Sequence, residues 1–136
     1  MLDFHNKNKK DFTLAILKVP NPRTCGIVEI DEYSNIVSFT EKPESPVSDL
    51  AFAGIMLSNP HLIDYFPEKD VFDLGYDVLP YIVGHASGYI IKDYLLDIGS
   101  PEKLNQAEED IKNRIYTLEI IGNSRVSYLG NERIGK

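Results

Sequence analysis

The segment Gly26–Pro43, GIVEIDEYSNIVSFTEKP, decides the fold of this chain. Two runs within it, residues 26–30 and 36–40, are rich in β-branched residues and have the length of short strands. Polar turn formers at residues 31–35 lie between them, so we expect two strands joined by a loop. The second strand leads directly into Glu41-Lys42-Pro43. The sequence therefore predicts a strand that ends by presenting a carboxylate and an ammonium group.

Apolar runs on either side extend this predicted sheet. Residues 12–19, FTLAILKV, form a near-continuous apolar run, which is typical of a strand covered on both faces. Residues 51–57, AFAGIML, give a second apolar strand, and residues 88–91 and 93–96 are shorter candidates. The order of these elements predicts an α/β domain with a mixed sheet.

Three helical segments are expected before the last of these strands. Residues 1–10 resemble the end of a helix, and because Met1 offers no N-cap we expect that helix to begin upstream. Asn59-Pro60 marks a second start, with the proline at the first helical position. Residues 77–83 predict a short helix interrupted by Pro80, with a strand as the alternative.

A longer helix is predicted after residue 100. Ser100 suits its N-cap, and Pro101 suits its first position. An apolar stripe recurs at three- and four-residue steps, at Leu104, Ala107, Ile111 and Ile115. This spacing indicates a face that packs against a core.

Composition limits the classes of partner. A net charge of −7 argues against binding to nucleic acid or to an anionic membrane through the overall field. No apolar run approaches the length of a membrane span, and the N-terminus lacks the pattern of a signal peptide. The single cysteine, Cys25, excludes an internal disulfide and fits a reducing, cytoplasmic setting. A phosphate ligand would need locally placed cations, backbone N–H groups or a metal.

Lys42 is the first candidate binding residue. Pro43 favours an extended backbone at Lys42, which would give its side chain a defined direction. An ammonium group suits phosphate oxygens, and Glu41 beside it would orient a sugar hydroxyl or the lysine itself. The alternative is a solvated, charged turn.

Gly54 lies inside an otherwise apolar strand. Glycine weakens a strand unless another group must approach the backbone closely. A ligand bonded by main-chain groups is one explanation, and a bulge or tight helix packing is the other.

Asp97 follows an apolar pair and precedes Gly99 and the predicted helix. Mg²⁺ typically takes one or two carboxylates together with substrate phosphates, so Asp97 is a candidate metal ligand. The alternative is a turn former that accepts hydrogen bonds from nearby backbone N–H groups.

The remaining candidates are weaker. Cys25 has no histidine near it in sequence, and His61 and His85 are expected at the surface. Acidic residues around the Gly75-Tyr76 turn resemble helix caps more than a metal loop; they are Asp70, Asp73 and Asp77.

Taken in order, four segments resemble the sugar-1-phosphate nucleotidylyltransferases: CGIVEIDEYSNIVSFTEKP, FAGIMLSNP, DVLP and YLLDIGSPEKLNQAEED. The resemblance covers about residues 2–110. LGYDVLP and YLLDIGSPE are most similar to the mannose-1-phosphate and heptose-1-phosphate guanylyltransferases. Members of the family join a sugar 1-phosphate to an NTP and release pyrophosphate. The resemblance also implies a mixed, mostly parallel, Rossmann-like sheet.

Roles for individual residues follow from the resemblance alone. It implies that the backbones of Gly26 and Gly54 line the sugar site. Glu41 and Lys42 would contact the sugar ring and its phosphate, with Lys42 also serving catalysis. Asp97 would be a catalytic ligand of Mg²⁺, which bridges the phosphates.

Two family features are absent from the sequence: the glycine-rich segment that holds the NTP phosphates, and a Gly-Asp pair that supplies a first metal aspartate. Residues 1–115 are therefore expected to be the C-terminal, sugar-binding half of a nucleotidyltransferase. Residues 116–136 would be an extension, either a β-hairpin or a flexible tail. The chain alone would be inactive and would self-associate through exposed sheet edges. A non-catalytic sugar-phosphate-binding or assembly module is the alternative, and a scaffold without a ligand is the third possibility.

Overall fold

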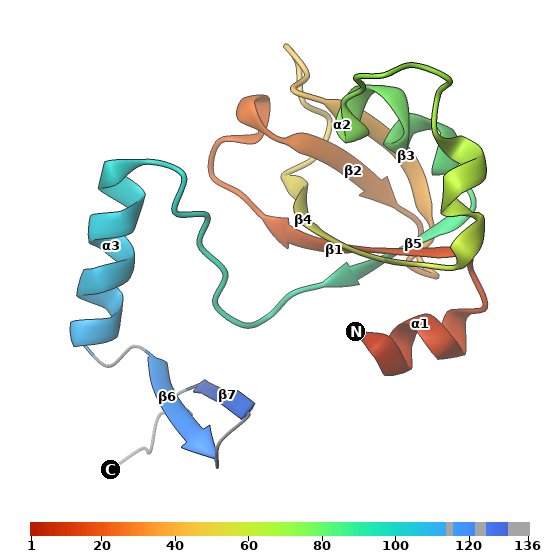
Figure 1. Cartoon of the computed structure of the whole chain (residues 1–136). Coiled ribbons are helices and arrows are strands. Elements are labelled where there is room, and N and C mark those ends of the chain that lie inside the picture. The colour runs from red at the N-terminus through yellow and green to blue at the C-terminus, as the bar shows by residue number, and fades with distance from the viewer. Residues whose placement is uncertain (114–115, 122–124, 131–136) are drawn as a thin grey trace. The chain divides into compact units, whose positions relative to one another are not determined.

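The computed structural model describes residues 1–113, 116–121 and 125–130, the last two ranges by their backbone alone. The chain divides into two compact units, Met1–Ile91 and Lys92–Lys136 (Figure 1). None of the helices in the described part of the chain has the length and apolar character that a membrane crossing requires.

The first unit is built on a five-stranded sheet of order β3-β2-β4-β1-β5, all of it within the described residues. Its strands are β1 (Phe12–Lys18), β2 (Gly26–Ile30), β3 (Ile36–Glu41), β4 (Leu50–Ser58) and β5 (Ala86–Ile90). The pairs β1–β4, β2–β3 and β2–β4 are antiparallel, whereas β1–β5 is parallel. The sheet is therefore mixed, as the sequence predicts.

β1 lies inside the sheet and is covered on both faces. Phe12, Leu14 and Ile16 belong to the apolar core, which helical residues such as Leu79 complete. Thr13, on the opposite face, is buried, and its hydroxyl lies 2.9 Å from the His5 ring. This arrangement explains why the run from residue 12 onward is almost uninterrupted by polar side chains.

Short helices surround the sheet. They are α1 (Leu2–Asn8), the 3-10 helices η1 (Pro22–Thr24), η2 (Pro60–Tyr65) and η3 (Leu79–Ile82), and α2 (Leu74–Asp77). The Phe4 ring of α1 meets the Tyr89 ring of β5 edge to face at 5.4 Å. Pro80 lies at the start of η3, so the predicted interruption separates α2 from η3.

The second unit contains α3 (Pro101–Lys112), β6 (Tyr116–Ile121) and β7 (Arg125–Gly130). The Ser100 side chain caps α3 by accepting a hydrogen bond from Lys103 N at 3.3 Å, as predicted. β6 and β7 pair antiparallel. Residues 122–124 and 131–136 lie outside the described residues, and the division into residues 1–115 and 116–136 stays a prediction.

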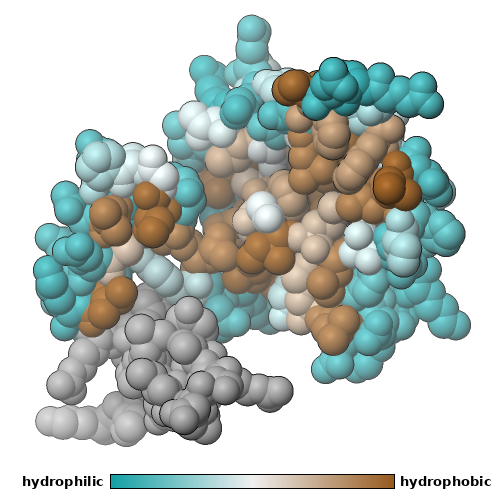
Figure 2. All heavy atoms as spheres, viewed as in Figure 1, coloured by the Kyte–Doolittle hydropathy of each residue, from teal (hydrophilic) through white to brown (hydrophobic). Residues whose placement is uncertain are grey.

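Two expectations from the sequence differ from the structure. A mostly parallel sheet is wrong for the described strands, because three of the four strand pairs in the five-stranded sheet are antiparallel. β2 and β3 are joined by a short loop that reverses the chain, which favours antiparallel pairing. Residues 93–96 form no strand, and the parallel neighbour of β1 in the described sheet is β5, which ends at Ile90. The packing of the apolar stripe on α3 stays a prediction; Figure 2 shows hydrophobic side chains among hydrophilic ones over α3, and Leu104 and Ile111 are 44% and 53% exposed. Ile115, the last residue of that stripe, lies outside the described residues.

Candidate functional site

Four of the predicted site residues gather at one end of the first unit's sheet. Gly26, at the start of β2, pairs with Glu41, at the end of β3. Lys42 follows, and its N–H donates to the Cys25 carbonyl at 3.0 Å. β4 runs antiparallel to β2 with Ile27 opposite Ala51, so Gly54 lies beyond the start of β2, toward the same end.

The Glu41 carboxylate is enclosed by two glycines. A Cβ on Gly26 would lie 2.6 Å from Glu41 Oε2, and a Cβ on Gly75 would lie 2.5 Å from the same oxygen. The side chain is only 15% exposed, and its Oε1 lies 3.7 Å from Lys42 Nζ. The Glu41 carboxylate therefore lies mostly enclosed beside a cation, and a Cβ on either glycine would collide with it.

Lys42 has a different backbone from the one the sequence predicts. Its φ is +45°, in the left-handed region, which disfavours residues with a Cβ and is not the extended conformation that Pro43 promotes. The bond from Lys42 N to Cys25 O continues the β2–β3 pairing while the chain turns away from the sheet. The ammonium group is attached to this turn, and the side chain is 55% exposed. It is thus accessible to an anion.

Gly54 occupies a bulge, one of the alternatives left open by the sequence. Leu14 pairs with Met56 and Ile16 with Phe52, so one residue of β1 faces three of β4. Gly54 has a φ of +76°, and a Cβ there would have no neighbour within 4 Å. The backbone therefore requires glycine for its conformation, and it also faces open space.

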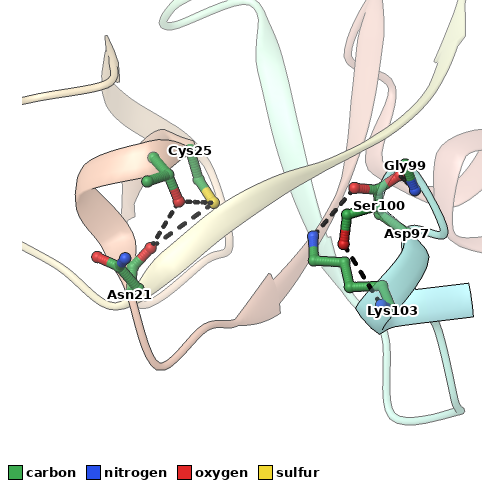
Figure 3. Close-up of polar contacts among 7 residues, drawn as sticks. Asn21, Cys25, Asp97, Gly99, Ser100 and Lys103 are labelled. Atoms are coloured by element: carbon green, nitrogen blue, oxygen red, sulfur yellow. Dashed lines mark hydrogen bonds and ion pairs between the residues drawn. The ribbon is translucent and has the colours of Figure 1, made fainter. Parts of the chain in front are cut away.

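Asp97, in the second unit, is held by its own segment (Figure 3). Its Oδ1 accepts from Gly99 N at 3.1 Å, and its Oδ2 accepts from Lys103 Nζ at 3.0 Å. The Lys103 ammonium, followed by the Gly99 N–H, places the pKa of Asp97 below its usual range. Asp97 thus acts as a turn former, and its side chain is 75% exposed. The meeting of Asp97 with Lys42 on one anion stays a prediction.

Replacing Lys103 with methionine is expected to raise the pKa of Asp97 toward its ordinary value, because the largest cause of the lowering is removed. A lowered carboxyl pKa stabilises the folded state above the unfolded pKa, and this contribution is lost as pH falls through the folded pKa. An NMR titration of the Asp97 carboxyl carbon measures the change. Lys112→Met, which breaks the 3.5 Å pair with Glu108, is the matched control and should leave the titration unchanged. An unchanged Asp97 titration in Lys103→Met would contradict the assignment.

Mg²⁺ fits this region only in part. Among the described residues, no three histidine, cysteine or acidic side chains lie together as a metal site would require. Asp97 is ionised, and the bonds from Gly99 and Lys103 go to different oxygens, which leaves lone pairs for a cation. It would act as one ligand, with the rest supplied by phosphates and water, as is usual for Mg²⁺.

Sequence analysis missed Gly75, whose contact with Glu41 comes from α2. Its only signal in sequence was a position between two acidic turn formers. The weaker candidates lie as expected: the Cys25 thiol is engaged with Asn21 O at 3.9 Å (Figure 3), and His61 and His85 have exposed side chains. Asp73 caps α2 by accepting from Tyr76 N, as its position suggested.

The chain is similar in sequence to a known protein family and to several curated proteins. The family model described as nucleotidyl transferase matches residues 1–114. The mannose-1-phosphate guanylyltransferase of Mycobacterium tuberculosis is 32% identical over 82% of this chain and 32% of the relative. A glucose-1-phosphate adenylyltransferase of Desulforamulus reducens is 33% identical over 82% of this chain and 31% of the relative.

A crystal structure described as a Bacillus anthracis glucose-1-phosphate thymidylyltransferase in complex with sucrose is similar in fold. Its TM-score is 0.65 at 21% identity, over 79% of this chain and 46% of that one. The chain spans about a third of the length of the curated relatives it matches. With a family model that matches most of its residues, the chain belongs to the nucleotidyl transferase family, as its resemblance to sugar-1-phosphate nucleotidylyltransferases predicted.

Proposed function

We propose that this chain is the sugar-binding part of an enzyme that joins a sugar 1-phosphate to an NTP and releases pyrophosphate. Its family and the placement of Glu41 and Lys42 at one end of the sheet support this proposal. A mannose- or heptose-like sugar and GTP are favoured, because the segments LGYDVLP and YLLDIGSPE resemble the guanylyltransferases. A cytoplasmic setting is part of the proposal, since the single cysteine suits a reducing compartment.

The chemistry assigned to the chain is binding and orientation. In the whole enzyme, an oxygen of the sugar phosphate attacks the α-phosphorus of the NTP, and pyrophosphate leaves. Lys42 binds the sugar phosphate through its charge, while the enclosed Glu41 carboxylate accepts hydrogen bonds from sugar hydroxyls. Mg²⁺, when bound at Asp97, would offset negative charge on the phosphates.

Calorimetric titration with a panel of sugar 1-phosphates, with and without Mg²⁺, tests the proposal. We expect binding of a mannose- or heptose-like phosphate that is tighter with Mg²⁺ and depends on Lys42. Absence of binding to every sugar 1-phosphate, with the chain folded, would refute it. A ligand-free scaffold domain, the third possibility, predicts that Lys42→Ala changes no titration.

The chain by itself is expected to release no pyrophosphate from an NTP and a sugar 1-phosphate. Phosphoryl transfer depends on positioning and charge stabilisation at both phosphate groups. One lysine, Lys42, and one metal carboxylate, Asp97, cannot hold both the triphosphate and the sugar phosphate in line. A coupled pyrophosphate assay measures this, and release above the blank would contradict it. A non-catalytic sugar-phosphate-binding or assembly module is the second candidate, and sugar-phosphate binding that never leads to transfer in the whole protein would favour it.

Self-association is also proposed. β3 and β5 are the outer strands of the described sheet, and a bridge from Asn35 to Ser87 joins part of their edges. The rest of each edge would favour pairing with another chain. Light scattering over a range of concentrations measures the mass of the species. A strictly monomeric species at the highest concentration would count against the proposal.

A further inference from the structure

We propose that Gly75 is a positioning residue that, together with Gly26, fixes the Glu41 carboxylate for hydrogen bonds from sugar hydroxyls. This inference rests on the proposed function. It separates two tasks at the site: Lys42 recognises phosphate, and the enclosed Glu41 recognises the sugar. The ligand it selects is therefore a phosphate that also carries hydroxyl donors.

The Glu41 side chain occupies the space that a Cβ on residue 75 would need. A Cβ there would lie 2.5 Å from Glu41 Oε2, 2.8 Å from its Cδ and 3.1 Å from its Cγ. Gly54 and Gly84 are the glycines with positive φ in the described residues, and Gly75 is not among them. Its backbone therefore suits any residue, and the space occupied by Glu41 is what requires glycine.

The turn that carries Gly75 is held independently of Glu41. Asp73 Oδ1 accepts from Tyr76 N at 3.1 Å, and Asp77 Oδ2 accepts from Asp73 N at 2.8 Å. Lys69 Nζ lies 2.8 Å from the same Asp77 oxygen and places the pKa of Asp77 below its usual range. If a methyl group is added at Gly75, we therefore expect the Glu41 side chain to move and α2 to stay in place.

Gly26 also approaches the Glu41 carboxylate, because a Cβ there would lie 2.6 Å from the same Oε2 and 2.7 Å from Phe39 Cζ. A methyl group on Gly75 would therefore displace Glu41 from the position that the two glycines leave open. Its exposure of only 15% in the native chain shows how closely that position is enclosed. The displaced carboxylate loses its alignment with the sugar, whereas Lys42, on its own turn, keeps its charge.

Gly75→Ala in the full chain tests the inference by calorimetry with mannose 1-phosphate. We expect affinity to fall roughly ten- to hundredfold, the range for a lost hydrogen bond to a charged group. In a chain that already carries Glu41→Ala, adding Gly75→Ala should change affinity less than about twofold, because no carboxylate remains to be displaced. Equal losses in both backgrounds, or no loss in the native background, would overturn the inference.

Gly84→Ala is the control. Gly84 has a φ of +86°, and a Cβ there would have no neighbour within 4 Å, so alanine strains the backbone without reaching Glu41. It should lower the thermal midpoint and leave affinity unchanged.

Thermal unfolding of the same variants separates this inference from the proposed function. Gly75→Ala should lower the midpoint of the native chain but not that of Glu41→Ala. Failure of the native chain to bind any sugar 1-phosphate would overturn the proposed function. An equal shift of the thermal midpoint by Gly75→Ala in the native chain and in Glu41→Ala would overturn the inference, whether or not the native chain binds a sugar 1-phosphate.

Discussion

Replacing Lys42 with methionine is expected to lower the affinity of the chain for a sugar 1-phosphate by roughly ten- to hundredfold, because a charge-assisted bond to phosphate is lost. Methionine keeps most of the length of the side chain and removes its charge. The loss should appear for every sugar 1-phosphate tested, since Lys42 is proposed to contact the phosphate group that they share. Calorimetric titration of the purified variant measures it.

Lys18→Met is the matched control for this prediction. Lys18 is a lysine of the same unit, paired with Asp49 at 3.1 Å on an exposed surface. Lys18→Met removes one positive charge, as Lys42→Met does, but no proposed contact with phosphate. A surface pair of this kind contributes little stability. Equal loss of affinity in Lys18→Met and Lys42→Met would show that the effect is one of net charge, and would contradict the site.

Lys42→Gly separates the backbone of this residue from its charge. A left-handed conformation costs a residue with a Cβ roughly 1–2 kcal/mol, and glycine avoids that cost. Glycine also loses more freedom on folding, so we expect a thermal midpoint equal to or slightly above that of the native chain. Affinity should fall as far as in Lys42→Met. A marked loss of stability would show that the lysine side chain is structural instead.

Replacing Gly26 with alanine is expected to lower both stability and affinity. The added Cβ would lie 2.6 Å from Glu41 Oε2 and 2.7 Å from Phe39 Cζ. Phe39 is buried in the core, and forcing an extra carbon into a packed region costs about 1–3 kcal/mol. The displaced carboxylate should reduce affinity for a sugar 1-phosphate as in Gly75→Ala. Denaturant unfolding and calorimetry measure the two effects.

A second change divides these two effects of Gly26→Ala. Adding Phe39→Leu replaces the ring that the new methyl group meets with a shorter side chain. This should recover part of the lost stability. It should leave affinity low, because the contact with Glu41 remains. Full recovery of affinity by Phe39→Leu would show that Gly26→Ala lowers affinity through its contact with Phe39 and not by displacing Glu41.

The strands of the first unit were predictable because their apolar residues decide the faces that they bury. Residues 12–16 are buried, and the sequence there is almost entirely apolar. The pairing direction was less predictable. The direction depends on which strands become neighbours in the sheet and on how the chain between them turns. The local pattern of apolar and polar residues carries no such information. The backbone of Lys42 was mispredicted because its bond to Cys25, the residue just before β2, outweighs the local preference set by Pro43.

The site shows the same division. Glu41, Lys42 and Gly26 were predicted as candidates from a motif, and the register of β2 and β3 brings them together. Gly75 was not identified, because Glu41 lies far from it along the chain and the reason for a glycine there is visible only in the packing of that side chain. Asp97 was identified by its place before a capped helix, and the local bonds to Gly99 and Lys103 that lower its pKa follow from that place.

The most direct test is a crystal structure of the chain with mannose 1-phosphate and Mg²⁺. Lys42 and Asp97 are predicted to approach one phosphate group, Lys42 through its ammonium and Asp97 through the bound cation, with the sugar hydroxyls against Glu41. A phosphate bound elsewhere, or one that Lys42 contacts while Asp97 lies too far away for a shared cation, would contradict the account.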